Sequence, residues 1–223
     1  MRSLKATPLL LLAGLIAGSS VSAGEWQILF DGSSAGAWRS LKHPAEAPLV
    51  WMVEDGALAW RKGAGHIISR EAFGDFELEL DWRIFPAGNS GIMFRVDETS
   101  KQPWQSGPEI QLLDNMGHRN GRNPLTTSGA LYRLYPPLQA ADRSIGEWNR
   151  LRLRVVGSRL QTWMNGTLIQ DCDMNGADWK ARVAKSKFAR FAGFGRSATG
   201  RIVLQDHGNP VWFRNVRIRE LPP

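Results

Sequence analysis

A short run of the sequence, "GPEIQLLDN" at residues 107–115, holds three side chains able to exchange protons or to form hydrogen bonds with a ligand. These side chains are Glu109, Gln111 and Asp114. Ile110 and Leu112 alternate with the first two, as in a strand with one face on an apolar core. An unpaired carboxylate facing that core would cost several kcal/mol, so the polar side chains should face a solvated cleft.

Asp114 breaks this alternation. Five positions after Glu109, it would point to the opposite face unless a β-bulge inserts one residue before it. We expect such a bulge, which returns Asp114 to the side of Glu109 and Gln111. In "NSGIMFRV" the same alternation puts the apolar residues in the core and Arg95 on the other face, so Arg95 is expected beside Glu109.

A second polar group occurs near the C-terminus, in "RIVLQDHGNP". Gln205 and His207 share one face of the expected strand, and Asp206 lies between them. Histidine titrates near neutrality, so His207 is a candidate to hold a proton, a metal ion or a substrate oxygen. The four histidines show no HExxH motif or comparable ligand spacing, so the sequence gives no metal motif.

Two loop residues are candidates for the cleft wall. Trp104 follows Pro103 just before the carboxylate strand, and an indole ring can stack on a sugar face. His118 lies in the polar loop "NMGHRNGRNP", where it is either exposed and inert or part of the cleft. Most of the other tryptophans are expected in the core.

The elements that must position these residues are strands. Period-two alternation over residues 76–84 predicts a strand with one buried face, and "WNRLRLRVV", "RLQTWM" and the Asn165-Gly166 turn predict a three-stranded meander. Further short strands are expected at residues 26–30, 51–54, 57–61, 92–96, 109–114, 202–205 and 213–220. A short helix or turn is expected within residues 176–191. This pattern predicts an all-β sandwich of two antiparallel sheets.

The first 23 residues have the pattern of a secretory signal peptide. Arg2 and Lys5 precede an apolar run over residues 9–17, and small residues precede a cleavage point after Ala23. The run is too short to span a bilayer, and no other stretch reaches the roughly 20 apolar residues of a membrane helix. We therefore expect export to the periplasm or the medium, no membrane insertion, and one mature domain over residues 24–223.

Charge and cysteine content exclude several classes of protein. The formal net charge is +7, but the basic residues are spread singly along strands rather than clustered with aromatics, which argues against nucleic-acid binding. Cys172 is the only cysteine, so an internal disulfide and a thiolate metal cluster are excluded. We expect Cys172 to be a small, partly buried apolar residue.

Eight segments of the mature chain together resemble a known family. In order, they are "ILFDGSSAGAW", "WMVEDGAL", "DFELELDWRI", "GNSGIMFRV", "GPEIQLLDN", "SGALYRLYPP", "GEWNRLRLRVVGSRLQTWMNG" and "LQDHGNPVWFRNVRIREL". The chain resembles the 3-keto-disaccharide hydrolase domain family, also called DUF1080, over nearly all of this length. The resemblance implies a concanavalin A-like jelly roll, whose two curved antiparallel sheets bind sugar on a concave face.

The resemblance also implies a reaction, the cleavage of glycosides whose C3 hydroxyl a separate sugar 3-dehydrogenase has oxidised to a ketone. The ketone acidifies the C2 proton, so a base can remove it, the enolate forms at O3, and the group on C1 leaves. Water then adds back, which gives net hydrolysis. This route needs a base near C2, a cationic or hydrogen-bonding group at O3, and an acid near the glycosidic oxygen.

Site residues follow from this implied reaction. Glu109 or His207 is expected to be the general base, Arg95 to stabilise the enolate, and Asp114 to act as the acid or to orient another group. Substrate binding is assigned to Arg95, Gln111, Gln205, Asp206, Asn89, Trp104, Tyr132 and His118. No cofactor is expected with certainty; a divalent cation held by Glu109, Asp206 or His207 would be an alternative to Arg95.

Two other functions remain open at this point. A retaining endoglucanase on the same fold would pair two carboxylates, but here Gln111 replaces the central Asp of that motif and Asp114 replaces the second Glu. A lectin-like module that binds carbohydrate without cleaving it is the other alternative, because the fold alone does not give function.

Overall fold

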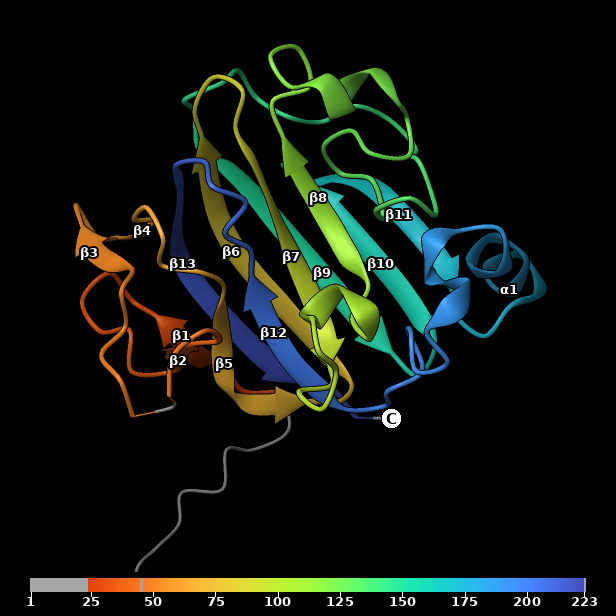
Figure 1. The fold of residues 1–223 in the computed structure, drawn as a ribbon, viewed down its shortest axis with the longest axis horizontal. Coiled ribbons are helices and arrows are strands. Elements are labelled where there is room, and N and C mark those ends of the chain that lie inside the picture. Colours follow the sequence, from red (N-terminus) through yellow and green to blue (C-terminus); the bar gives the residue numbers. More distant parts are fainter. Residues whose placement is uncertain (1–23, 45, 223) are drawn as a thin grey trace, which may run out of the picture.

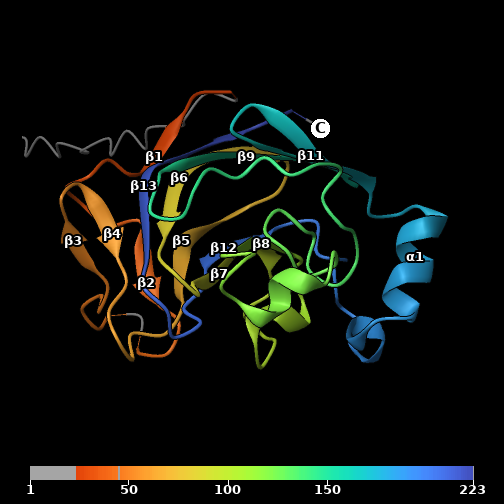
Figure 2. The same cartoon turned by 90° about the horizontal axis from the view of Figure 1, so that it is seen from above.

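The computed structural model describes residues 24–44 and 46–222 and folds them into two packed antiparallel sheets (Figure 1). The predicted signal peptide, residues 1–23, lies outside the described residues. Figure 2 shows the two sheets as separate layers, one behind the other in the view of Figure 1.

The larger sheet has eight strands. Across the sheet they are β11 (Thr167–Asp173), β10 (Arg159–Met164), β9 (Asn149–Val156), β6 (Phe76–Ile84), β13 (Val211–Glu220), β4 (Ala57–Ala59) and β3 (Met52–Glu54), and β1 (Gln27–Phe30) also pairs with β13. Asn165 and Gly166 between β10 and β11 have φ angles of 51° and 84°, which confirms the positive φ expected of this hairpin turn.

The smaller sheet has five strands. Their order is β2 (Trp38–Ser40), β5 (Ile67–Phe73), β12 (Gly200–Leu204), β7 (Asn89–Val96) and β8 (Glu109–Leu113). Within residues 24–44 and 46–222, the helical segments are α1 (Ala177–Ala184) and three short 3₁₀ turns, η1 (Pro103–Gln105), η2 (Arg119–Arg122) and η3 (Lys187–Arg190). None of the helices in the described part of the chain is long and apolar enough to cross a membrane.

The main core lies between the two sheets. It takes alternate residues of β6, such as Leu78 and Leu80, and alternate residues of β8, Ile110 and Leu112. The sequence expectation of a two-sheet sandwich is therefore confirmed. Cys172 is a free thiol and is buried, as expected.

The outward face of the larger sheet carries a charge ladder, which we define as the acidic residues of β6 and their arginine partners. The ladder pairs are Glu77–Arg219, Glu79–Arg217, Asp81–Arg150 and Asp81–Arg214, with nitrogen–oxygen distances of 2.8, 2.6, 2.9 and 3.4 Å. The Glu77 and Asp81 carboxylates are buried, whereas their arginine partners are partly exposed, so solvent screens these pairs only in part. The pairs keep this face polar, which confirms the one-sided alternation predicted for residues 76–84.

The smaller sheet is buried on both faces near its centre. A second apolar cluster of Ile68, Met93, Val96 and Val203 lies apart from the main core and packs against Trp104. Because both faces of β5 are apolar at its start, the strand lacks a period-two pattern, and the sequence analysis did not predict β5 or β2.

Candidate active site

A polar cavity of about 210 Å³ lies where β7, β8 and the end of β12 meet. Glu109 and Gln111 point into it, whereas their strand neighbours Ile110 and Leu112 belong to the core, so the cavity opens on the outward face of the smaller sheet. The residues that line it are His66, Asn89, Trp104, Glu109, Gln111, Tyr132, Lys187, Gln205 and His207. Seven of these were predicted from the sequence; His66 and Lys187 were not.

Glu109 is the buried carboxyl of this cavity, with 7% of its surface exposed. Burial raises its pKa to about 7, against the opposing effects of the Lys187 charge and a hydrogen bond from the Gln205 side chain. The carboxyl group lies across Gly91 on β7, where an added Cβ would stand 2.2 Å from Glu109 Oε1. Glycine at this position therefore makes the space that the carboxyl group occupies.

Three amide side chains, Asn89, Gln111 and Gln205, line the cavity together with the carboxyl group. Gln111 Nε2 donates to Asn89 Oδ1 at 2.7 Å and to the Ser90 carbonyl oxygen at 3.3 Å. Gln205 Oε1 is buried and has no hydrogen-bond partner among the described residues. A buried acceptor of this kind normally has a partner, so Gln205 is suited to accept a hydrogen bond from a hydroxyl of a bound ligand.

His66 also lines the cavity, and the sequence analysis did not predict it. Its Nδ1 accepts a hydrogen bond from the Asp206 backbone N–H at 3.0 Å. Burial lowers the pKa of His66, the Asp206 charge opposes this shift, and His207 adds to it. The ring is therefore neutral at pH 7, and because Nδ1 is an acceptor, its proton is on Nε2.

Asp206 itself does not line the cavity, so its predicted role in substrate binding is corrected. Its Oδ1 accepts from Trp60 Nε1 at 2.6 Å and from the Gly208 N–H at 2.7 Å, and its Oδ2 accepts from the Gly65 N–H at 2.8 Å. These contacts tie three chain segments together. Asp206 is thus a residue that fixes loops next to the cavity.

The rim of the cavity is aromatic and basic. The Lys187 ammonium nitrogen lies 4.6 Å from the ring centroid of Trp104 and 4.8 Å from that of Tyr132. His207 is exposed at the rim, and its ring centroid is 6.5 Å from that of His118. His118 therefore stands beside the site without lining the cavity.

Arg95 does not line the Glu109 cavity, so the prediction that it lies beside Glu109 was wrong. Between the pairs Arg201↔Val96 and Val203↔Met93, β7 has one residue more than β12. The bulge turns Arg95 to a φ of 48° and reverses the alternation, which the sequence analysis had expected to break only at Asp114.

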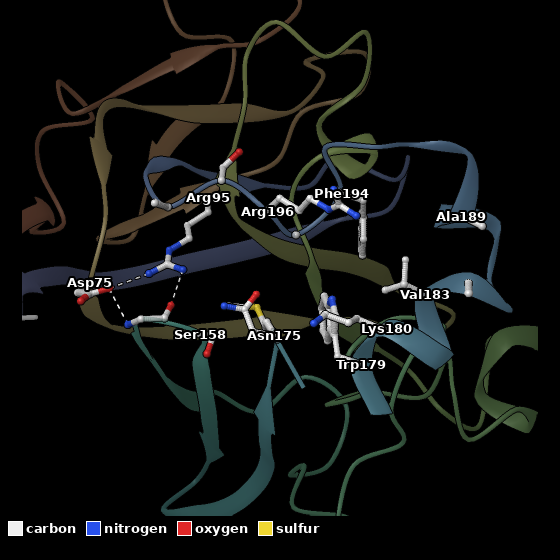
Figure 3. Close-up of a pocket in the computed structure, with 16 residues that line it drawn as sticks. Asp75, Arg95, Ser158, Asn175, Trp179, Lys180, Val183, Ala189, Phe194 and Arg196 are labelled. Carbon is white, nitrogen blue, oxygen red and sulfur yellow. Dashed lines mark hydrogen bonds and ion pairs between the residues drawn. The ribbon is translucent and has the colours of Figure 1, made fainter. Parts of the chain in front are cut away.

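The guanidinium group of Arg95 is bound inside a different cavity, of about 760 Å³ (Figure 3). It pairs with Asp75 at 2.8 Å and donates to the carbonyl oxygens of Gly74 and Gly157 at 3.0 and 2.8 Å. This larger cavity contains none of the residues that line the Glu109 cavity. Although this cavity is larger, we do not take it as the candidate site, because the one acidic residue that lines it, Asp75, is paired with Arg95.

Asp114 was also misplaced. β8 ends at Leu113, and the β7–β8 pairing continues without a bulge. The Asp114 carboxylate instead accepts the backbone N–H groups of Ala87 at 2.8 Å, Met116 at 3.0 Å and Gly117 at 2.9 Å. Burial would raise the pKa of Asp114, but these N–H groups hold it below its usual value. Asp114 caps a turn outside the cavity.

The described residues do not assemble the expected metal ligands. Within residues 24–44 and 46–222, no three or more His, Cys, Asp or Glu side chains are grouped so that they could hold a metal ion. Asp206 is engaged by N–H donors, as described above, so Glu109, Asp206 and His207 do not form a ligand set.

Comparison with known proteins gives consistent matches. The family of 3-keto-alpha-glucoside-1,2-lyase-like domains matches residues 25–219. The 3-keto-disaccharide hydrolase of Bacteroides thetaiotaomicron is 29% identical over 233 residues, which cover 90% of this chain and 80% of the relative.

Solved structures agree on the fold. A crystal structure of a proposed glycosyl hydrolase from Parabacteroides distasonis has a TM-score of 0.81 at 29% identity and covers 88% of this chain and 94% of that chain. A Bacillus subtilis protein with a galectin-like fold has a TM-score of 0.55 at 14% identity, over 90% of this chain and 96% of that chain. The second likeness shows the fold alone. The predicted concanavalin A-like jelly roll is thereby confirmed.

Proposed function

The chain belongs to the family of 3-keto-alpha-glucoside-1,2-lyase-like domains, and from this membership we propose that it is a carbohydrate-active enzyme that cleaves the glycosidic bond of 3-keto-glycosides. The name of the Bacteroides thetaiotaomicron relative supports this substrate class. The proposed reaction is removal of the C2 proton, elimination of the group on C1, and addition of water.

The buried carboxyl of Glu109 carries the proposal. A general base works best when its pKa lies near the working pH, and burial raises the pKa of Glu109 to about 7. The carboxyl group is also one wall of a cavity lined by amides and aromatic rings, a combination that suits a sugar ring. An ordinary surface glutamate would be too weak a base for carbon acid chemistry at neutral pH.

The electron flow is as follows. Glu109 takes the C2 proton, and the electron pair of that C–H bond moves through C2–C3 onto the ketone oxygen. The enolate then re-forms the C3 ketone, a C1–C2 double bond forms, and the bond from C1 to the glycosidic oxygen breaks. The leaving oxygen takes a proton, for which exposed His207 at the rim is the proposed donor. Addition of water across C1–C2 completes hydrolysis.

The remaining cavity residues have binding roles in this proposal. Gln111, Asn89 and Gln205 orient sugar hydroxyls, and Gln205 brings an acceptor that has no partner among the described residues. Trp104 and Tyr132 at the rim contact the faces of the sugar. The endoglucanase alternative finds no support, because Asp114 is a turn cap and supplies no second carboxylate to the cavity.

The proposal includes export of the enzyme and an upstream partner. The sequence of residues 1–23 supports export to the periplasm or the medium. The C3 ketone of the substrate must come from oxidation of a C3 hydroxyl, so a sugar 3-dehydrogenase would act first. Detection of the mature N-terminus at Gly24 in the periplasmic fraction or the medium would test export.

The enzymatic proposal is tested with pure mature protein and a set of 3-keto glycosides: 3-keto forms of sucrose, trehalose, lactose and simple glucosides. Release of 3-keto-glucose or an unsaturated 3-keto sugar is followed with and without a chelator, which also tests for a divalent cation. We expect turnover, and a loss of about 100-fold or more in Glu109→Gln, while exposed Glu25→Gln serves as the matched control.

Three outcomes would contradict this proposal. Turnover of none of these substrates would reject the substrate class. Retention of activity within tenfold in Glu109→Gln would remove Glu109 as the base. Tight binding of 3-keto sugars without any turnover would support the lectin-like alternative instead.

A further inference from the structure

His66, one of the residues that line the Glu109 cavity, has a ring N–H without an acceptor among the described residues. Its Nδ1 is occupied by the backbone N–H of Asp206 at 3.0 Å. In a neutral imidazole, one ring nitrogen accepts and the other donates, so the hydrogen is on Nε2. No hydrogen bond or ion pair of Nε2 occurs within the described part of the chain. The His66 ring therefore offers a hydrogen-bond donor, Nε2–H, that no described residue occupies.

The orientation of this ring is fixed from two sides by a single residue. The Asp206 backbone N–H binds the ring, and Asp206 Oδ2 accepts the N–H of Gly65, the residue that precedes His66, at 2.8 Å. Asp206 is itself held by Trp60 Nε1 at 2.6 Å. A donor that is already oriented needs little reorganisation when charge develops on a substrate oxygen, and such donors contribute strongly to catalysis.

The cavity holds two groups that could stabilise an enolate, His66 and Lys187. The sequence analysis gave this role to Arg95, whose guanidinium group is bound to Asp75 in another cavity. Lys187 stands at the rim over Trp104 and Tyr132 and is exposed, so it is the alternative whose role the experiment must separate.

We propose that His66 is a catalytic residue that donates its Nε2–H to the C3 oxygen while that oxygen carries the enolate charge. The inference rests on the proposed function, since it assigns a group to one step of that reaction. When Glu109 takes the C2 proton, the electron pair reaches O3, and O3 accepts a stronger hydrogen bond from Nε2. No proton leaves His66, and the bond weakens again when the C3 ketone re-forms.

A neutral donor suits this role better than a cation would. Burial lowers the pKa of His66, the charge of Asp206 opposes this shift, and nearby His207 strengthens it. A neutral ring does not form an ion pair with the Glu109 carboxylate. Such an ion pair would stabilise the ionised carboxylate and weaken it as a base.

The experiment compares His66→Phe and His66→Gln with wild type, with Lys187→Met run in parallel and His43→Phe as the matched control. Cleavage of a 3-keto glycoside and exchange of its C2 hydrogen with D₂O are both measured. We expect kcat to fall about 100-fold to 1,000-fold in His66→Phe, with slowed exchange and a nearly unchanged KM. His66→Gln, which retains an N–H donor, should recover part of the exchange rate. Thermal unfolding confirms that each variant is folded.

A second measurement does not depend on activity. Nitrogen-15 NMR of the wild-type imidazoles should show His66 neutral at pH 7 with its hydrogen on Nε2. A hydrogen on Nδ1, a His66→Phe variant within threefold of wild type in kcat and exchange, or a loss confined to Lys187→Met would overturn the role of His66. If wild-type protein neither cleaves nor exchanges any 3-keto glycoside, the proposed function fails, and the catalytic role of His66 fails with it. The tautomer result would then still test the structural argument separately.

Discussion

Replacing Glu109 with glutamine should abolish activity and at the same time stabilise the protein at alkaline pH. Glu109 is 7% exposed, and burial raises its pKa from 4.5 to about 7. Because the folded state binds the proton more tightly than the unfolded state, this group stabilises the folded state fully below pH 4.5. That stabilisation is lost as the pH rises through 7. Glutamine does not titrate, so the stability of the Glu109→Gln variant does not fall over this pH range for this reason.

The size of the effect follows from the shift in pKa. A difference of about 2.5 pKa units corresponds to about 3 kcal/mol between the limits of low and high pH. Between pH 5 and pH 8, wild type should lose about 2 to 3 kcal/mol that Glu109→Gln does not lose. For a chain of this length, that difference corresponds to roughly 5–10 °C in melting temperature.

The assay is thermal or urea unfolding of wild type, Glu109→Gln and the exposed control Glu25→Gln from pH 5 to pH 8. The stability advantage of Glu109→Gln over wild type should grow with pH, whereas Glu25→Gln should follow wild type throughout. Parallel pH curves for wild type and Glu109→Gln would show that Glu109 has an ordinary pKa, and the argument for a buried base would be refuted.

Three further predictions concern the same cavity and its surroundings. The rate at which the wild-type enzyme exchanges the C2 hydrogen of a 3-keto glycoside with D₂O should increase with pH and reach half its maximum near pH 7, since Glu109 must lose its proton to act as a base and this step precedes protonation of the leaving group; an exchange rate that is flat from pH 5.5 to 8.5 would contradict this. Gly91→Ala should lower kcat at least tenfold because its Cβ would stand 2.2 Å from Glu109 Oε1, and kinetics of the folded variant at wild-type levels would exclude that contact. Arg95→Met should lower the free energy of unfolding by about 2–4 kcal/mol, as measured with urea, because Asp75 loses its ion-pair partner. The folded variant should keep a near-wild-type kcat. A large loss of kcat would instead show that Arg95 takes part in the reaction.

The strands with one wet face were the part of the fold that the sequence could predict. β6 and β9 alternate between apolar core residues and charged residues of the outward face, and the turns after β9 and β10 contain Gly157 and Asn165-Gly166, so both pattern and turn chemistry were visible. β5 was invisible to this reasoning because Ile67 faces the main core while neighbouring Ile68 faces the second apolar cluster. A strand that is apolar on both faces carries no periodicity.

The candidate site could be predicted only where backbone alternation continued without interruption. Glu109 and Gln111 were placed correctly because β8 is regular up to Leu113. The prediction for Arg95 failed because a bulge with a positive φ angle reverses the faces of β7 at this residue. No residue type in that segment indicates a bulge. His66 could not be found because its partner Asp206 lies 140 residues away, so the pairing exists only in three dimensions.

The charge ladder and the Glu109 cavity lie on the outward faces of the two sheets, with the main core between them. A linker, fluorophore or solid support attached along the β6 side would therefore leave the entrance for sugar unobstructed. The exposed back of the larger sheet is the natural place to anchor this protein for single-molecule observation or for use in a flow reactor.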